Sequence, residues 1–450
     1  MRQNKDYLIT EKPSRALLIF SIPMIIGNLF QQAYTIVDSA IVGRYVGETA
    51  LAAVGASYAL TSIFICIAIG GGIGASVIIS HHFGAHNYGR MKTCIRTALL
   101  SFLFISLILG GVGLIFSQQI MEVLNTPADA IDIAVTYLNI YFLGLPFLFM
   151  YNILSSMFNA LGESRIPLYL LIFSSVLNIF LDLYMVAVLN LGVAGAAYAT
   201  FISQGISAVL SLIIFVVTLQ QLQGKAEGWF SKTEFSDMSR IALPSILQQS
   251  TVSIGMMLVQ SVVNSFGTQI LAGFSAAMRI ESLCVVPMSA IGNAMSSYTA
   301  QNIGAEKEER ISQGYRMGNF MIIVIAVILC LFLEIAHKPL IALFLDNAAS
   351  SQTIVTGESY LKFIGFFFCM IGFKMAVDGI LRGAGAVKVF TIANMVNLTL
   401  RVTIAKFGAP IWGVSIVWYA VPLGGLANFL ISYGYYRTEK WKEAASKTVD

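Results

Sequence analysis

Residues 97–117 read TALLSFLFISLILGGVGLIFS, a run of 21 residues without a charged side chain. As a helix, a run of this length rises about 30 Å, which is the thickness of the hydrocarbon core of a bilayer. Its apolar residues are continuous and do not alternate, whereas the strands of a membrane β-barrel alternate over about ten residues. The run is therefore predicted to be a transmembrane helix.

The rest of the chain has the same character. Of its 450 residues, 57% are hydrophobic and only 11% are charged, whereas a soluble domain carries about 25% charged residues. A water-soluble globule and a disordered chain are both excluded. The predicted fold is an all-α polytopic membrane protein with twelve transmembrane helices, at about 16–43, 51–80, 93–117, 132–160, 166–190, 194–220, 240–266, 271–301, 314–337, 353–381, 388–408 and 411–436.

The Lys and Arg residues are distributed unevenly between the two sides of the membrane. With alternating crossings, 20 of the 27 fall on the side that holds both termini, and only Arg44 and Lys338 fall in the opposite loops. By the positive-inside rule, both termini are predicted to be cytoplasmic. An odd number of spans would spread the Lys and Arg residues over both sides of the membrane, so the uneven distribution also supports an even number. We expect a multi-pass protein of the plasma (inner) membrane.

The two halves of the sequence resemble each other at a shift near 220. Matching residues include Gly47 with Gly267, Gly84-Ala85 with Gly304-Ala305, Arg90 with Arg310, and Tyr137-Leu138 with Tyr360-Leu361. Six spans return the chain to its starting side, so the repeat is parallel, with a pseudo-twofold axis along the membrane normal. The predicted domains are a six-helix lobe at 1–220, a cytoplasmic linker at 221–239, a second six-helix lobe at 240–437 and a cytoplasmic tail at 438–450.

Two six-helix lobes of this kind are typical of a transporter, in which a cavity at the lobe interface opens to either side. The sequence has no GxxxxGK[ST] phosphate loop, so no nucleotide use is predicted. A pump of this kind would be driven by an ion gradient.

Two acids lie within spans of the N-terminal lobe, where a charge costs at least about 2.5–3.5 kcal/mol. Asp38 follows Tyr34 by four residues, and Asp182 follows Asn178 by four, so each pair shares a helix face. The spans of this lobe hold no buried Lys or Arg that would neutralise the acids. We therefore interpret them as functional. The alternative is that each carboxylate only hydrogen-bonds a neighbouring helix and stabilises the lobe.

The C-terminal lobe holds a second candidate polar site in which acids and cations are mixed. Lys374 lies four residues before Asp378 in span 10, Arg401 lies in span 11 and Glu281 lies in span 8. An internal ion pair of Asp378 with Lys374 or Arg401 explains them as well as a role in transport does. The glycine run at 70–74 is interpreted as close helix packing and not as a phosphate site.

Motifs along the whole chain resemble those of the multidrug and toxic compound extrusion (MATE) family, and the N-terminal lobe looks most like its prokaryotic DinF-type branch. They are Pro23-Met24-Ile25-Ile26-Gly27-Asn28, Val37-Asp38 with Val42-Gly43, residues 47–55 (GETALAAVG), Phe83-Gly84-Ala85, Asn159-Ala160-Leu161-Gly162, residues 178–182 (NIFLD) before residues 192–197 (GVAGAA), residues 301–305 (QNIGA) and residues 381–385 (LRGAG). The order and spacing of these strings over twelve spans carry the resemblance.

The resemblance implies cation-driven drug export by alternating access of the two lobes. In the DinF-type branch, an acid of span 1 and an Asn/Asp pair of span 5 are implicated in proton coupling, with a Tyr of span 1 and a Thr of span 6 in the same network. The matching residues here are Asp38, Asn178, Asp182, Tyr34 and Thr200. Another branch couples to sodium through acids in spans 7 and 10, but span 7 (240–266) has no acid here and only Asp378 remains.

The predicted function is a secondary active multidrug exporter that antiports cationic or amphipathic small molecules against H⁺. No enzymatic activity, cofactor, metal, nucleotide or nucleic-acid partner is predicted, and a monomer in contact with membrane lipid is expected. The alternatives are a Na⁺-coupled drug exporter and a flippase of a lipid-linked saccharide on the same fold. An integral membrane enzyme is disfavoured because the short loops lack a cluster of His, Asp or Glu.

Overall fold

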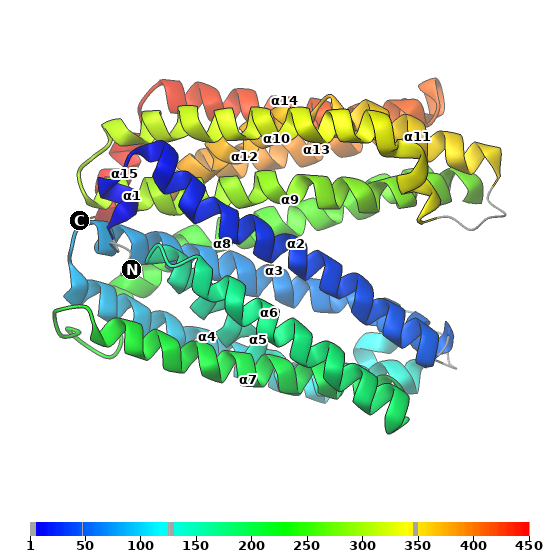
Figure 1. The fold of residues 1–450 in the computed structure, drawn as a ribbon, viewed down its shortest axis with the longest axis horizontal. Coiled ribbons are helices and arrows are strands. Elements are labelled where there is room, and N and C mark those ends of the chain that lie inside the picture. Colours follow the sequence, from blue (N-terminus) through cyan, green and yellow to red (C-terminus); the bar gives the residue numbers. More distant parts are fainter. Residues whose placement is uncertain (1–5, 47, 125, 127–129, 345–349, 450) are drawn as a thin grey trace. The chain divides into compact units, whose positions relative to one another are not determined.

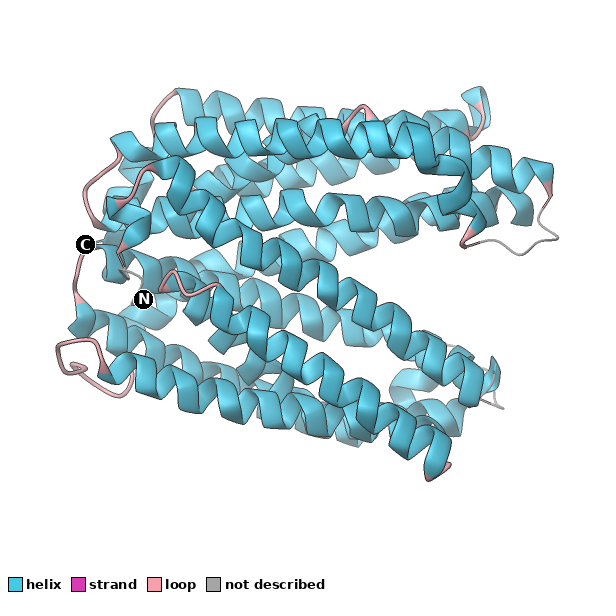
Figure 2. Ribbon diagram, in the orientation of Figure 1, coloured by secondary structure: helices cyan, strands magenta, loops and turns pink. Residues whose placement is uncertain are grey.

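The computed structural model describes residues 6–46, 48–124, 126, 130–344 and 350–449, and every regular element in these ranges is a helix (Figure 1, Figure 2). The first half contains α1 (Tyr7–Thr10), α2 (Pro13–Tyr45), α3 (Glu48–Gly84), α4 (Tyr88–Val123), α5 (Ile131–Ala160), α6 (Arg165–Asp182), a π-helix η1 (Leu183–Val188) and α7 (Gly192–Gln220). The second half contains α8 (Lys232–Asn264), α9 (Thr268–Gly304), α10 (Glu309–Ala342), α11 (Ser351–Gly365), α12 (Phe368–Gly383), α13 (Val387–Trp412), α14 (Ser415–Arg437) and α15 (Trp441–Val449).

The described helices confirm the predicted number of spans. Eleven of them, with α6 and η1 taken as one, are long and apolar enough to cross a membrane. The helices α11 and α12 pass the same test together, but they meet at an angle of 54°. With that pair counted as one broken span, the total is twelve.

Two predicted spans differ from the helices observed. Span 353–381 was expected to be continuous, but it breaks between Gly365 and Phe368, where the Phe367 N–H bonds to the Ile364 carbonyl at 2.9 Å and tightens the turn. Helix α8 begins at Lys232, within the segment predicted as linker. The Ser231 hydroxyl accepts a hydrogen bond from the Glu234 N–H at 3.3 Å and so caps the helix there.

By packing, the chain divides into two compact units, and the boundaries between them fall inside two long helices. Unit 1 consists of the described residues up to Ile25 and from Leu247 onward, and unit 2 consists of Ile26–Ile246. The first part of α2 therefore packs in unit 1, and the first part of α8 packs in unit 2. This division describes packing and not the sequence repeat, so the predicted lobes at 1–220 and 240–437 stay a prediction.

In unit 2, α5 packs against α3, α4 and α7 (Figure 1). The glycine run of α3 allows its neighbours to approach closely. A Cβ atom at Gly70 would lie 2.5 Å from the backbone nitrogen of Ile246 on α8, and one at Gly72 would lie 2.5 Å from Ser156 Oγ on α5. These contacts support the interpretation that the run serves helix packing.

In unit 1, α9 packs against α10, α11 and α12, while α14 packs against α12 and α13. The short helix α1 is held on α9, because Asn302 Nδ2 donates to the Leu8 carbonyl at 3.2 Å. Phe20 of α2 and Tyr298 of α9 are fully buried in the same hydrophobic core. Unit 1 thus has its own core, in which the polar residues of α9, α12, α13 and α14 are embedded.

Candidate ion-coupling site

The five residues predicted for ion coupling all lie in unit 2, on three helices. Tyr34 and Asp38 are one turn apart on α2, Asn178 and Asp182 are one turn apart on α6, and Thr200 lies on α7. Asn178 and Asp182 are almost inaccessible, at 1% and 0% exposure. The structure therefore brings together residues that are far apart in the sequence.

Asn178 is the centre of this network. With its amide oriented so that nitrogen faces acceptors and oxygen faces donors, Nδ2 lies 2.7 Å from Asp182 Oδ2 and 3.1 Å from the Tyr34 hydroxyl. Its oxygen lies 3.1 Å from the backbone nitrogen of Thr200 and 3.3 Å from Thr200 Oγ1. Because Thr200 Oγ1 also donates to the Ala196 carbonyl at 3.1 Å, its single proton serves one acceptor at a time.

The carboxyl groups of Asp38 and Asp182 lie within hydrogen-bonding reach of each other. One oxygen of each, Oδ1, is buried without a protein donor in the described part of the chain. Among the described ion pairs, none involves either acid. Two carboxyl groups in contact and without a cationic partner resist carrying two negative charges together, so the pair can hold a proton or a bound cation.

The backbone changes from an α-helix to a π-helix after Asp182. This residue is the last of α6, and the π-helix η1 begins at the next position. The Leu189 N–H bonds to the carbonyl of Tyr184, five residues earlier, at 2.9 Å. Such wide turns are rare and occur frequently at functional sites. The sequence predicted a continuous span here and gave no signal for the π-helix.

A sixth residue of the site, Tyr137 of α5, was missed from the sequence. Its buried hydroxyl interacts electrostatically with both Asp38 and Asp182. Tyr137 also lines a cavity of about 20 Å³ together with Tyr141, Thr200 and Gln204, which is room for about one water molecule. A tyrosine in an apolar run carries no signal of its own. Its match with Tyr360 in the repeat was the single sequence feature that marked the position.

The candidate polar residues of the C-terminal half lie in unit 1 and form two groups. Lys374 Nζ lies 2.9 Å from Asp378 Oδ2 and 3.2 Å from Asn394 Oδ1, and Ser432 Oγ donates to Asp378 Oδ1 at 2.9 Å. Of the two cations considered for Asp378, the structure pairs it with Lys374.

The second group of unit 1 contains Glu281, which accepts a hydrogen bond from the Tyr360 hydroxyl at 2.6 Å. Arg401 interacts electrostatically with Glu281. Both cations of the predicted C-terminal site therefore interact with an acid, Lys374 through an ion pair and Arg401 electrostatically, in contrast to the two acids of unit 2.

Comparisons with known proteins agree with this architecture. The MatE family profile matches residues 23–184 and again residues 244–406, once in each half of the chain. The probable multidrug resistance protein YpnP of Bacillus subtilis (strain 168) is 31% identical over 430 residues, covering 95% of this chain and 96% of that protein. A FAD transporter of Shewanella oneidensis is 23% identical over 437 residues, with 96% of each protein covered.

A solved structure described as a multidrug resistance MATE family transporter of the MOP superfamily has the same fold. It superposes with a TM-score of 0.91 at 23% identity, covering 99% of this chain and 100% of that one. The match to the MatE family and the likeness to YpnP identify a multi-pass transporter of the cell membrane, not an enzyme. The chain belongs to the MatE family, and the match of one profile to both halves confirms the internal repeat.

Proposed function

We propose that this transporter is a secondary active exporter that moves cationic or amphipathic small molecules out of the cell in exchange for H⁺. It works by alternating access, as a monomer and without a cofactor. The observation that carries the proposal is the contact between the carboxyl groups of half-buried Asp38 and buried Asp182 in unit 2, without a cationic partner among the described residues.

The surroundings of the two acids favour a proton over a sodium ion. Asn178 donates to Asp182, and a shared proton between Asp38 and Asp182 relieves the repulsion of two carboxylates. A sodium ion takes several oxygen ligands, and here the Asn178 oxygen is turned toward Thr200. Because burial disfavours the charged form of a carboxyl group, the pair takes up a proton on the acidic side and releases it on the other.

The charge pattern of the buried residues favours a cationic cargo. Unit 2 carries two acids without a buried cationic partner, whereas Lys374 and Arg401 of unit 1 have acids beside them. A positively charged drug is attracted to the charged form of the acid pair, and protonation removes that attraction. Proton and drug then exclude each other at one site, which is the requirement for antiport. The name of the YpnP relative, a probable multidrug resistance protein, supports drugs as the cargo.

The proposal is tested by exporting a fluorescent cation from cells that express Asp38→Asn or Asp182→Asn. Asparagine keeps the shape of the side chain and removes the titrating charge, so both variants should reach the membrane at normal levels and lose export. Asp132→Asn is the matched control, because Asp132 is an exposed acid in the first turn of α5. Normal drug resistance in either buried-site variant would contradict the assignment.

A further inference from the structure

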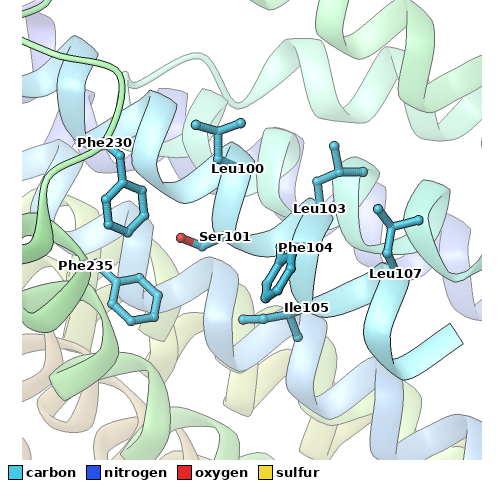
Figure 3. A pocket seen from close by; sticks show the side chains of 8 residues that line it. All are labelled: Leu100, Ser101, Leu103, Phe104, Ile105, Leu107, Phe230 and Phe235. Atoms are coloured by element: carbon cyan, nitrogen blue, oxygen red, sulfur yellow. The ribbon is translucent and has the colours of Figure 1, made fainter. Parts of the chain in front are cut away.

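Helix α4, the segment before α8 and the first turn of α8 line an apolar groove of about 490 Å³ (Figure 3). Leu100, Leu103 and Leu107 line it from α4, and the rings of Phe230 and Phe235 line it from the other side, with their centroids 6.0 Å apart. Of the eight lining residues, seven are apolar, and the hydroxyl of the eighth, Ser101, is turned back to the Thr97 carbonyl at 2.7 Å. The groove therefore offers its contents no polar partner.

The wall opposite α4 is held in place by hydrogen bonds along that helix. The Glu227 N–H donates to Thr93 Oγ1 at 2.9 Å, and the Ser231 N–H donates to Thr97 Oγ1 at 3.0 Å. One turn earlier, Lys92 Nζ donates to the carbonyls of Leu222 and Gly224 at 2.7 and 2.8 Å. The segment that connects the two sequence repeats is thus fixed along α4 and presents Trp229 and Phe230 beside it.

A cation and an exposed indole lie at the mouth of the groove. Arg96 precedes Leu100 by one helical turn, and its guanidinium lies 4.6 Å from the centre of the Trp229 ring. Its one described hydrogen bond goes to the Gly228 carbonyl at 3.4 Å, which leaves most of its five N–H donors available. Trp229 is 74% exposed, as expected for an aromatic residue that lies at a membrane–water interface. Lys232, also exposed, adds a second cation three residues later.

The length of the groove matches one leaflet of a bilayer. From Arg96 to Leu107 the helix rises about 16 Å, half of the hydrocarbon thickness. The face of α4 that carries Arg96, Leu100, Leu103 and Leu107 is therefore cationic at headgroup level and apolar down to the middle of the membrane. A glycerophospholipid has the complementary arrangement of charge and hydrocarbon.

From these features we propose that unit 2 binds an anionic glycerophospholipid, with its headgroup at Arg96 and Lys232 and an acyl chain in the groove. The nearby acids do not cancel the cations. Glu234 is buried against His82 at 3.0 Å, and the Glu227 carboxylate lies beside Gly89, about two turns away from Arg96. The bound lipid packs on Phe230 and so stabilises the linker on α4. This site is independent of the proposed proton coupling, because its test does not require transport.

The test measures quenching of Trp229 fluorescence by lipids with brominated acyl chains, with Trp412, Trp418 and Trp441 replaced by Phe. Purified protein is placed in bilayers with increasing fractions of dibrominated phosphatidylglycerol or dibrominated phosphatidylcholine. Half-maximal quenching should need about thirtyfold less phosphatidylglycerol, which corresponds to about 2 kcal/mol for two cations near the headgroup. Equal quenching by the two lipids would overturn the proposal.

Two pairs of matched variants locate the site. Arg96→Gln leaves Lys232 in place and should lower the preference for phosphatidylglycerol to about fivefold, whereas Arg90→Gln, which removes an exposed cation on the same helix, should keep the full preference. Ser101→Phe fills the groove and should reduce quenching by both lipids, whereas Val112→Phe, on an exposed position of α4, should not. Equal loss of preference in Arg96→Gln and Arg90→Gln would mean that surface charge alone attracts the lipid, and would overturn the proposal.

If the variant with a single tryptophan does not fold, native mass spectrometry of the otherwise unchanged chain replaces the fluorescence measurement. The chain should then retain more phosphatidylglycerol than its Arg96→Gln variant, and Arg90→Gln should behave like the unchanged chain. Equal retention by all three would overturn the proposal.

Discussion

Asn178 connects three helices because an amide offers both donors and acceptors. Its nitrogen serves Asp182 on its own helix and Tyr34 on α2, while its oxygen faces Thr200 on α7. The sequence predicted that Asn178 and Asp182 share a face, because they are four residues apart on a helix. It could not predict that Asn178 faces Tyr34 and Asp182 faces Asp38, because that depends on how α2 and α6 pack. Thr200 entered the prediction through the family resemblance alone.

The ion pair of Lys374 and Asp378 should contribute to stability. Removing one partner of a buried pair leaves an uncompensated charge and costs about 3–5 kcal/mol. We therefore expect Lys374→Met to lower the melting temperature of the purified protein markedly. The double variant Lys374→Met with Asp378→Asn should recover most of the loss, because neither charge remains.

The control for this prediction is Lys442→Met, which removes an exposed cation 2.8 Å from Glu439. Exposed pairs contribute about 0–1 kcal/mol, so the melting temperature should hardly change. A Lys374→Met protein as stable as the unchanged chain would show that the buried pair does not stabilise unit 1.

Helices α3 and α8 approach each other at a glycine. A Cβ atom at Gly74 would lie 2.6 Å from the Met238 carbonyl oxygen and 2.7 Å from Ala242 Cβ. Helix propensity alone predicts that Gly74→Ala stabilises α3 by about 1 kcal/mol. Because the added methyl group has no room, we expect the opposite, a lower melting temperature. Gly111→Ala on α4 is the control, since nothing lies within 4 Å of the added atom. It should leave stability unchanged or slightly higher.

The long helices were predictable from apolar runs, because each run is bounded by polar clusters that mark its ends. The break between α11 and α12 was not predictable from the sequence, because the residues around Phe366 and Phe367 are as apolar as those of an unbroken span. The start of α8 at Lys232 could have been found from Ser231 and Glu234, which have the spacing of a capping box. Charged residues in that segment favoured a linker instead.

At the scale of the whole molecule, the repeat was visible in the sequence because corresponding spans keep small residues at corresponding positions. The sequence did not show that the first part of α2 packs in unit 1 and the first part of α8 packs in unit 2. Where two helices such as α3 and α8 pack closely, the sequence shows the glycines at the contact but does not identify the helix that packs against them.

Competition between proton and drug predicts how binding depends on pH. Protonation neutralises Asp38 and Asp182, so the affinity for an ethidium-like cation should fall as the pH drops from about 8 to 6. The double variant Asp38→Asn with Asp182→Asn should bind weakly and independently of pH. Fluorescence titration of the purified protein measures both. An equal fall in affinity in the double variant would show that other groups hold the drug.

The most direct test of the account is transport of a fluorescent cation in proteoliposomes under one imposed gradient at a time. A pH gradient without sodium should drive uphill movement of the cation, and a sodium gradient at equal pH should not. The Asp38→Asn, Asp182→Asn protein should show no uphill movement under either gradient. Transport that follows the sodium gradient and ignores the pH gradient, or that persists in the double variant, would contradict proton coupling through the carboxyl pair of unit 2.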